Sequence, residues 1–169
     1  EVEHNVINDL SDFGFIHGLP HDQSLQAVRV GVDRLVIVAS QHIDINPVIT
    51  LKEFKNYQLI LLLERFKIRQ EIKMHFQQAG HNLDDFNILL SLDSIESIKS
   101  TVIKGYGVSI LPYTSVKKEL YNKQLKEIKI QELDMTYEIY LINKPDKEMR
   151  RCVKNCISFF KKIGEKSFC

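Results

Sequence analysis

The stretch that decides the class of fold, residues 86–112, reads FNILLSLDSIESIKSTVIKGYGVSILP. Its two short apolar runs, 86–91 and 107–111, are typical of strands that are covered on both faces. The residues between the runs show helical periodicity, with one apolar face made of Ile95, Ile98 and Val102. A strand, a helix and a second strand in this order predict a parallel sheet with right-handed crossovers.

The ends of this predicted helix carry signals of their own. Asp93 and Glu96 are three residues apart at its start, so we expect a capping box in which Asp93 is the N-cap residue. Ser94 then lies one residue after the predicted cap. Gly105 is expected to end the helix, because glycine readily adopts the left-handed conformation found just after a helix.

The same strand–helix unit precedes this stretch along the chain. Residues 58–63 form another apolar run, and the apolar positions that follow fall on one helical face, which Gly80 is expected to end. After the last strand, Thr114 or Ser115 is expected to cap a short helix. Residues 125–130 combine apolar residues with lysines, which indicates a more exposed strand or an edge strand.

Both ends of the chain lack partners within these units. Extended segments are predicted at residues 12–16, 25–30, 34–40 and 137–143. The last helix has a clean apolar face, and a simple explanation is a second lobe made from both chain ends. We therefore expect an α/β protein with mainly parallel sheets and two lobes. Lobe one comprises residues 1–31 and 136–169, and lobe two comprises residues 32–135.

The composition limits the classes of function. The 169 residues are 44% hydrophobic and 27% charged, which is typical of a soluble globular protein. With 23 basic and 22 acidic residues the net charge is +1, so charge alone indicates neither nucleic acid nor a membrane as partner. The longest apolar run, residues 59–63, is far shorter than the roughly 18 residues of a membrane span. No secretion leader is visible at the start.

The cysteines and histidines give no cofactor signal. Three cysteines do not make a disulfide framework, so we expect reduced thiols and a cytoplasmic location. Cys152 and Cys156 are four residues apart, a spacing compatible with a metal pair on one helix face. Both also fall on the apolar face of the last helix, where a buried free cysteine acts as a small hydrophobe. The histidines show no ligand spacing, and we expect neither a metal nor another cofactor.

No catalytic motif is present in the sequence. It has no nucleophile elbow, no P-loop and no Cys–His pair in a recognisable context. The Gly105-Tyr106-Gly107 segment precedes a strand, whereas a dinucleotide-binding fingerprint follows one. We therefore expect no enzymatic activity.

Four stretches in a fixed order carry a resemblance to a known family. They are DFGFIHG at residues 12–18, DRLVIVA at residues 33–39, the 92–112 stretch with its SIESIK and GYGVSILP segments, and the strand at 137–144 with the helix after it. In this order and spacing, the chain resembles the effector-binding domain of LysR-type transcriptional regulators.

The resemblance implies a fold similar to type II periplasmic binding proteins, with an effector cleft between two α/β lobes. It implies a transcription factor that a small polar or anionic metabolite controls, and that binds DNA through a helix-turn-helix domain absent from this chain. The first strand and helix of lobe one are also absent, so lobe one is expected to be incomplete at its N-terminal end. Self-association, as dimers and as tetramers of the full-length protein, is expected to use the 69–79 helix.

Two other classes of protein share this kind of fold. A solute-binding protein of a transport system would have a secretion leader and a longer chain. An enzyme of the same fold would need a reactive cysteine or clustered arginines in the cleft, and we find neither. A winged helix-turn-helix encoded upstream would favour the regulator, and a leader peptide would favour the transport protein.

The resemblance also implies effector-binding residues in lobe two. Ser94 is expected to bind an anionic effector with its hydroxyl and the nearby N–H groups, although a serine there can serve the helix alone. Asp93 stands where the family often has glycine and would repel an anion if it pointed inward. Arg65 and Lys67 can supply point charges and Phe66 an aromatic wall, or they are exposed loop charges and a core side chain.

Other candidates lie at strand ends and in a helix. Gly18 and Leu19 follow a strand of lobe one and are expected at the mouth of the cleft, with His17 beside them. Gly18 is also expected to let the backbone turn. Ser91 ends a strand at the carboxyl edge of lobe two, where a polar strand end is the simpler explanation. Arg69 matches a family arginine or is a surface residue.

Overall fold

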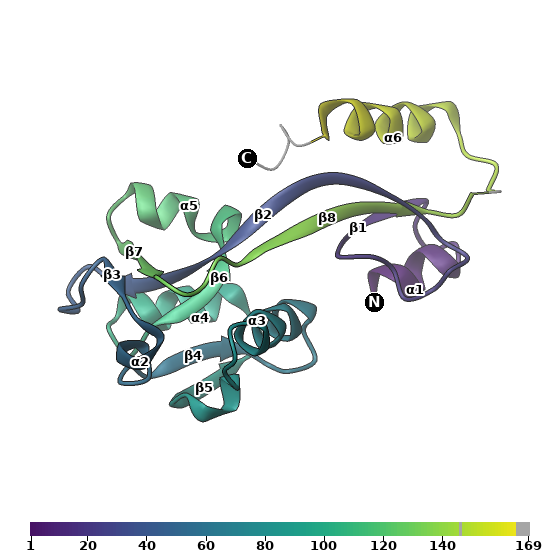
Figure 1. The fold of residues 1–169 in the computed structure, drawn as a ribbon. Coiled ribbons are helices and arrows are strands. Elements are labelled where there is room, and N and C mark those ends of the chain that lie inside the picture. The colour runs from purple at the N-terminus through teal and green to yellow at the C-terminus, as the bar shows by residue number, and fades with distance from the viewer. Residues whose placement is uncertain (146, 165–169) are drawn as a thin grey trace. The chain divides into compact units, whose positions relative to one another are not determined.

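The chain divides into two compact units, drawn as a ribbon in Figure 1. A computed structural model describes residues 1–145 and 147–164. Unit 1 consists of Glu1–Asp33 and Tyr137–Cys169, and unit 2 consists of Arg34–Thr136. The polypeptide passes from unit 1 into unit 2 within β2 (Gln26–Ser40) and returns at the start of β8 (Thr136–Asn143).

The centre of unit 2 is a strand that is buried along its whole length. β4 (Leu59–Leu62) is an unbroken apolar run, and all of it is buried. It pairs in parallel with β5 (Ile88–Leu92), and a parallel bridge joins Leu59 to Val108, just before β6 (Ser109–Pro112). The predicted strand–helix–strand units are confirmed here, since each crossover returns the chain in the same direction.

Two helices make these crossovers, α3 (Lys67–Gln78) and α4 (Ile95–Ile103). Their buried faces include the apolar residues Ile72, Phe76, Ile98 and Val102. Gly80 and Gly105 follow the helices with φ angles of 78° and 84°. Both predicted helix ends are therefore confirmed, because this left-handed conformation is the one that glycine adopts at low cost.

The remaining strands of unit 2 do not follow the predicted parallel pattern. β2 runs antiparallel to both β6 and β7 (Leu125–Ile130), whereas the short β3 (Val48–Ile49) is parallel to β7. The expectation of mainly parallel sheets is wrong for this part of the fold. The reason is that β2 enters as a continuous strand rather than through a helical crossover, so nothing forces it to run in the common direction.

β7 is not an edge strand, which corrects a second expectation. β2 pairs with one side of it and β3 with the other. Its apolar residues Leu125, Ile128 and Ile130 are all buried. Lys126 is accommodated because its ammonium donates to the backbone oxygens of Ile43 and Ile45, at 2.6 and 3.3 Å.

Three short helical elements complete unit 2: α2 (Leu51–Phe54), the 3-10 turn η1 (Leu83–Asp85) and α5 (Tyr113–Tyr121). α2 begins with a capping box that sequence reasoning missed, in which the Thr50 N–H donates to Glu53 at 2.7 Å. α5 begins directly after Pro112 and has no side-chain cap, so the expected cap at Thr114 or Ser115 is wrong. Pro112 is itself the N-cap residue, with φ −56° and ψ 133°, so the helix begins before either expected capping residue.

Unit 1 is built around the antiparallel pair of β1 (Phe13–His17) and β8, with α1 (Val2–Ile7) packed on β1. Its core includes Val6, Ile16, Leu25 and Ile142.

β2 is one continuous strand where we expected two extended segments. Where the chain crosses between units, the buried Tyr137 hydroxyl donates to Asp33 at 3.0 Å. Burial and the charge of Asp33 raise the pKa of Tyr137.

The last helix, α6 (Arg151–Ile163), is anchored by part of its apolar face. Val153 and Ile157 are buried, and the ring of Phe160 lies 4.9 Å from that of Phe15. Cys152 and Cys156 are exposed, so their expected burial is wrong. The apolar pattern of α6 is wider than the face that unit 1 covers. Cys169 lies outside the described residues. Among the described residues, no helix is long and apolar enough to cross a membrane.

Gly107→Ala is expected to destabilise the protein by about 3 kcal/mol. A Cβ atom at this position would lie 2.5 Å from the backbone oxygen of Gln58, which accepts the Val108 N–H at 2.9 Å. That oxygen cannot move aside without breaking the bridge between β4 and the chain before β6. Urea unfolding followed by circular dichroism measures the loss.

Gly105→Ala is the matched control. It has open space around the new Cβ but a φ of 84°, so the expected loss is only about 1 kcal/mol. Equal losses for the two variants would contradict the steric explanation.

Candidate functional site

Two loops meet at one edge of the sheet in unit 2. β4 and β5 pair in parallel up to Leu62 and Leu92, and the Leu63 N–H donates to the Leu92 carbonyl at 2.9 Å. The carboxyl ends of both strands therefore lie together, and α3 and α4 follow directly. We call residues 63–67 and 91–95 the helix-start edge. Ligands of open α/β sheets bind at such edges, because helix N-termini present N–H groups there.

Ser94 is the N-cap residue of α4. Its backbone is extended, with φ −138° and ψ 133°, and its Oγ accepts the Ser97 N–H at 3.5 Å. The predicted capping box at Asp93 is wrong, because the helix begins at Ile95 and leaves Asp93 exposed outside it. The Ser94 hydroxyl uses one lone pair in the cap, so its hydrogen can still be donated to a ligand.

The start of α3 has no side-chain cap. Phe66 occupies the N-cap position in an extended conformation, and its ring packs partly buried against the core of unit 2. Arg65 is exposed, and its guanidinium carbon lies 5.0 Å from the centre of the Phe66 ring. Lys67 is the first residue of the helix and is half-buried. Cationic side chains beside a helix start without a capping side chain favour an anionic ligand.

Arg69 is buried, so the alternative that it is a surface residue is wrong. It is 4% exposed, and its Nη1 atom has no hydrogen-bond partner among the described residues. Burial lowers the pKa of its guanidinium, against the opposing effect of the charges on Glu64 and Asp84. A buried donor without a partner costs roughly 1–3 kcal/mol. An acceptor delivered to this nitrogen would recover that free energy.

The other candidates divide between the two units. Ser91 is exposed on β5 and belongs to the helix-start edge. Gly18 has a φ of 67°, which confirms the predicted backbone turn. Leu19 is exposed, and the His17 ring lies 4.6 Å from the Tyr137 ring. Unit 2 thus brings together Ser91, Ser94 and residues 65–67, whereas residues 17–19 belong to unit 1.

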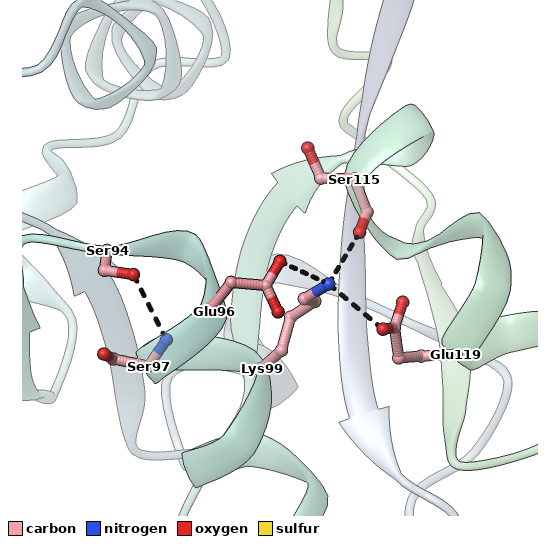
Figure 2. A network of polar contacts seen from close by, with 6 residues as sticks. All are labelled: Ser94, Glu96, Ser97, Lys99, Ser115 and Glu119. Carbon is pink, nitrogen blue, oxygen red and sulfur yellow. Dashed lines mark hydrogen bonds and ion pairs between the residues drawn. The ribbon is translucent and has the colours of Figure 1, made fainter.

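An ion cluster joins α4 to α5 (Figure 2). The Lys99 ammonium lies 2.7 Å from a carboxylate oxygen of Glu96 and 3.0 Å from one of Glu119 on α5. It also donates to the backbone oxygen of Ser115 at 3.2 Å. The side chains of Lys99 and Glu119 are only 10% and 14% exposed. The cluster therefore ties α4 to α5 through shielded charges.

The pKa shifts of Lys99 and Glu119 both favour the charged forms of these residues. Burial disfavours the charged form of Lys99, but its bonds to Glu96 and Glu119 outweigh that cost and raise its pKa. Burial also works against the Glu119 carboxylate, and the bond from Lys99 nevertheless lowers its pKa. The second oxygen of Glu119 is buried without a hydrogen-bond partner among the described residues. Among the causes that lower the pKa of Glu119, the hydrogen bond from Lys99 is the largest.

Sequence reasoning missed this cluster. The three-residue spacing of Glu96 and Lys99 was visible, but Lys99 lies between the apolar positions Ile98 and Val102. Its second partner, Glu119, comes 20 residues later, so only the packing of α5 against the sheet brings the two together.

A cavity of about 290 Å³ lies beside β2 and β7, and none of the predicted site residues lines it. Arg34 and Glu127 line it and are joined by hydrogen bonds of 2.5 and 3.1 Å, and Lys129 and Asp134 line it as well. The cationic and anionic residues of its lining are therefore equal in number. The described residues hold no cluster of three or more His, Cys, Asp or Glu side chains that could bind a metal ion.

Comparison with known proteins identifies relatives of this chain. The family model for the LysR substrate binding domain matches residues 1–164. A probable RuBisCO transcriptional regulator of Cyanophora paradoxa is 26% identical over 151 residues, which are 86% of this chain and 47% of the relative. The chain thus spans about half the length of this curated relative.

Solved structures show the same fold. The regulatory domain of CcmR from Synechocystis PCC6803, in complex with 2-PG, has a TM-score of 0.83 at 18% identity, over 96% of this chain and 78% of that one. The effector binding domain of QuiR, in complex with shikimate, has a TM-score of 0.82 at 18% identity, over 99% and 78%. At these identities the likeness establishes the fold, and the fold implied by the resemblance is confirmed.

Lys99→Met is expected to destabilise the protein by about 3 kcal/mol at pH 7, because the Glu119 carboxylate would stay buried without its partner. Since the pKa of Glu119 is lowered, the contribution of the pair is present above the ordinary carboxyl value of 4.5 and is lost as the pH falls through the lowered pKa. Since the pKa of Lys99 is raised, the contribution is complete below 10.5 and is lost as the pH rises through the raised pKa.

Urea unfolding of wild type and variant at pH 7 and at acid pH measures this deficit, which is expected to shrink in acid. Lys117→Met, the same change at an exposed position of α5, is the control and is expected to cost less than about 0.5 kcal/mol. A deficit independent of pH would mean that Lys99 stabilises by packing alone.

Proposed function

Because the chain belongs to the LysR substrate binding domain family, we propose that it is the ligand-sensing domain of a DNA-binding transcription factor. The observation that carries this proposal is the helix-start edge. There two helices begin side by side after paired strands, and the first turn of one of them holds a buried guanidinium whose Nη1 lacks a partner among the described residues. Such an arrangement stabilises a bound ligand without any reactive group.

The proposed ligand is a small anionic or polar metabolite. Arg65, Lys67 and Arg69 place three cationic side chains within the start of α3 and the loop before it. Asp93 is exposed outside α4, which leaves the Ser94 hydroxyl and the α4 N–H groups to act as donors. The 2-PG and shikimate of the two structural relatives make acids the first ligands to test. His17, Gly18 and Leu19 stay predictions that rest on the resemblance.

The complete protein is proposed to bind DNA through a helix-turn-helix domain outside this chain. It is proposed to act in the cytoplasm and to have no catalytic role. The names of curated relatives support a regulator: besides the Cyanophora paradoxa protein, they include an uncharacterised HTH-type transcriptional regulator of Escherichia coli. A solute-binding protein of a transport system has no comparable support.

The sensing mechanism is proposed to be a population shift. We assign lobe one of the family fold to unit 1 and lobe two to unit 2. A ligand shifts a two-state equilibrium only through different affinities for the two states. Moving the population from 1:99 to 99:1 requires a ratio of affinities of about 10⁴. The metabolite is therefore proposed to favour one arrangement of the domain, and the DNA-binding domains respond.

Ser94→Ala and Ser94→Asp test the site. A thermal-shift screen with inorganic phosphate, sulfate, 2-PG and shikimate first identifies an anion that binds. At about 100 times Kd such an anion is expected to stabilise the chain by about 2.7 kcal/mol and to raise Tm by about 5–10 °C. Ser94→Ala is expected to weaken binding about tenfold or more, because a hydrogen bond to a charged group is lost.

Ser94→Asp separates capping from binding. Aspartate is as good an N-cap as serine, so its stability is expected to stay near wild type while its charge abolishes anion binding. Ser100→Ala, an exposed position of the same helix, is the control and is expected to change neither. An unchanged affinity for Ser94→Asp would exclude the helix-start edge as the binding site, and failure of every anion in the screen would contradict the proposed ligand class.

Self-association is proposed to use α3, on which Met74 is a large exposed apolar side chain. Met74→Glu is expected to raise the dissociation constant of the self-associated chain about tenfold or more, since a charge would be desolvated in the interface. Sedimentation velocity over a range of concentrations measures this. Ser100→Glu adds the same charge to another exposed helix position and is expected to have no effect. Sedimentation of wild type as a monomer at all concentrations would count against the pairing.

A further inference from the structure

Two exposed thiols lie one helical turn apart on α6. Cys152 and Cys156 are both free and exposed, and residues four apart on a helix share one face, with Cβ atoms about 5–6 Å apart. We propose that this pair is a chelating site for soft, thiophilic ions that bind two thiolates, with trivalent arsenic as the representative. The site is separate from the helix-start edge and does not depend on the proposed function.

The packing of α6 holds this face outward. The residue after each cysteine, Val153 and Ile157, is buried, so one apolar stripe anchors the helix. The Phe160 ring lies 4.9 Å from the Phe15 ring and adds a third anchor one turn later. Because the anchored stripe and the two thiols are offset by one residue, the helix keeps both sulfurs on its uncovered side. Such preorganisation reduces the cost of binding a bidentate ligand.

The separation of Cys152 and Cys156 on the helix suits two thiols bridged by a bound atom better than it suits a disulfide. A disulfide needs Cβ atoms about 3.5–4.5 Å apart, which is shorter than the separation of about 5–6 Å that an intact helix gives. Closing the bond would therefore require the first turns of α6 to unwind. An atom placed between the two sulfurs spans the longer gap, so the pair can chelate such an atom while the helix stays intact.

The number of ligands excludes a structural zinc site in the described part of the chain. Zinc in such sites takes four protein ligands, and no cluster of three or more His, Cys, Asp or Glu side chains exists among residues 1–145 and 147–164. Soft thiolates favour soft metal ions. A centre that needs only two thiolates from the protein is therefore the one that this pair can hold.

The exposed Phe159 supplies an apolar neighbour. It follows Cys156 by three residues, so it lies on an adjoining part of the same helix face, and it is 57% exposed. An arsenical with an aryl group can cover this ring while its arsenic holds the two sulfurs. Phenylarsine oxide is therefore the probe that fits the surface.

The chemistry of this probe balances without an oxidant or reductant. Each thiol forms one As–S bond, the arsenic–oxygen bond breaks, and the two thiol protons leave with the oxygen as water. Arsenic stays trivalent throughout. A single thiol forms only one such bond, so its adduct exchanges readily with an excess of a small monothiol.

The test is intact mass spectrometry of the 169-residue chain after treatment with phenylarsine oxide and an excess of 2-mercaptoethanol. Wild type is expected to retain one phenylarsenic group per chain and to release it to the dithiol dithiothreitol. Cys152→Ser and Cys156→Ser are each expected to lose the retained adduct. Their apparent affinity for phenylarsine oxide is expected to fall by about 100-fold or more, since the second As–S bond is no longer intramolecular. The Tm of both variants is expected to stay unchanged, because both positions are exposed.

Cys169→Ser is the matched control and is expected to retain the group as wild type does. Four results would each overturn the proposal. They are no retained group on wild type, retention by Cys152→Ser, retention by Cys156→Ser, or loss by Cys169→Ser, which would place the chelate on another pair of thiols.

Discussion

The parallel pairing of β4 with β5 is the constraint on which unit 2 depends. β4 is buried along its whole length, so its backbone donors and acceptors must find partners in the neighbouring strands. The pairing that satisfies them also brings the loops after both strands to one edge of the sheet. The hydrogen bond from the Leu63 N–H to the Leu92 carbonyl joins the two segments at this edge. The starts of α3 and α4 are therefore adjacent because of a backbone requirement. Whatever these helices bind, their N–H groups are placed by the sheet before any ligand arrives.

Two buried cationic residues of α3 and α4, Arg69 and Lys99, differ in their polar partners. Lys99 contacts Glu96, Glu119 and the backbone oxygen of Ser115, so its charge is matched and α4 is joined to α5. Arg69 is equally buried, but its Nη1 has no partner among the described residues. The charge of Lys99 is thus compensated by direct ion pairs, whereas one donor of the Arg69 guanidinium is left without a hydrogen bond among the described residues.

The surface of unit 1 shows why an amphipathic pattern overstates burial. α6 has apolar residues over a broad sector, yet only Val153 and Ile157 are buried against the unit. The apolar pattern predicted that Cys152 and Cys156 are buried, but both are exposed. The neighbouring elements, and not the pattern, set the width of the face that is covered. β7 is the reverse case. Its lysines suggested an edge, but the two-residue β3 covers its outer side and carbonyl oxygens receive Lys126.

The sequence by itself determined the strand–helix units, their glycine ends, and the family to which the chain belongs. These features depend on local periodicity and backbone conformation, which neighbouring residues encode. Of the candidate site, it located Ser94 and residues 65–67, since helix starts after buried strands are also local signals. Only the tertiary structure decided the strand directions of β2, the N-cap at Ser94 instead of Asp93, the burial of Arg69 and the partner of Lys99. Each of these depends on which distant segments pack together, and no pattern within one segment specifies that.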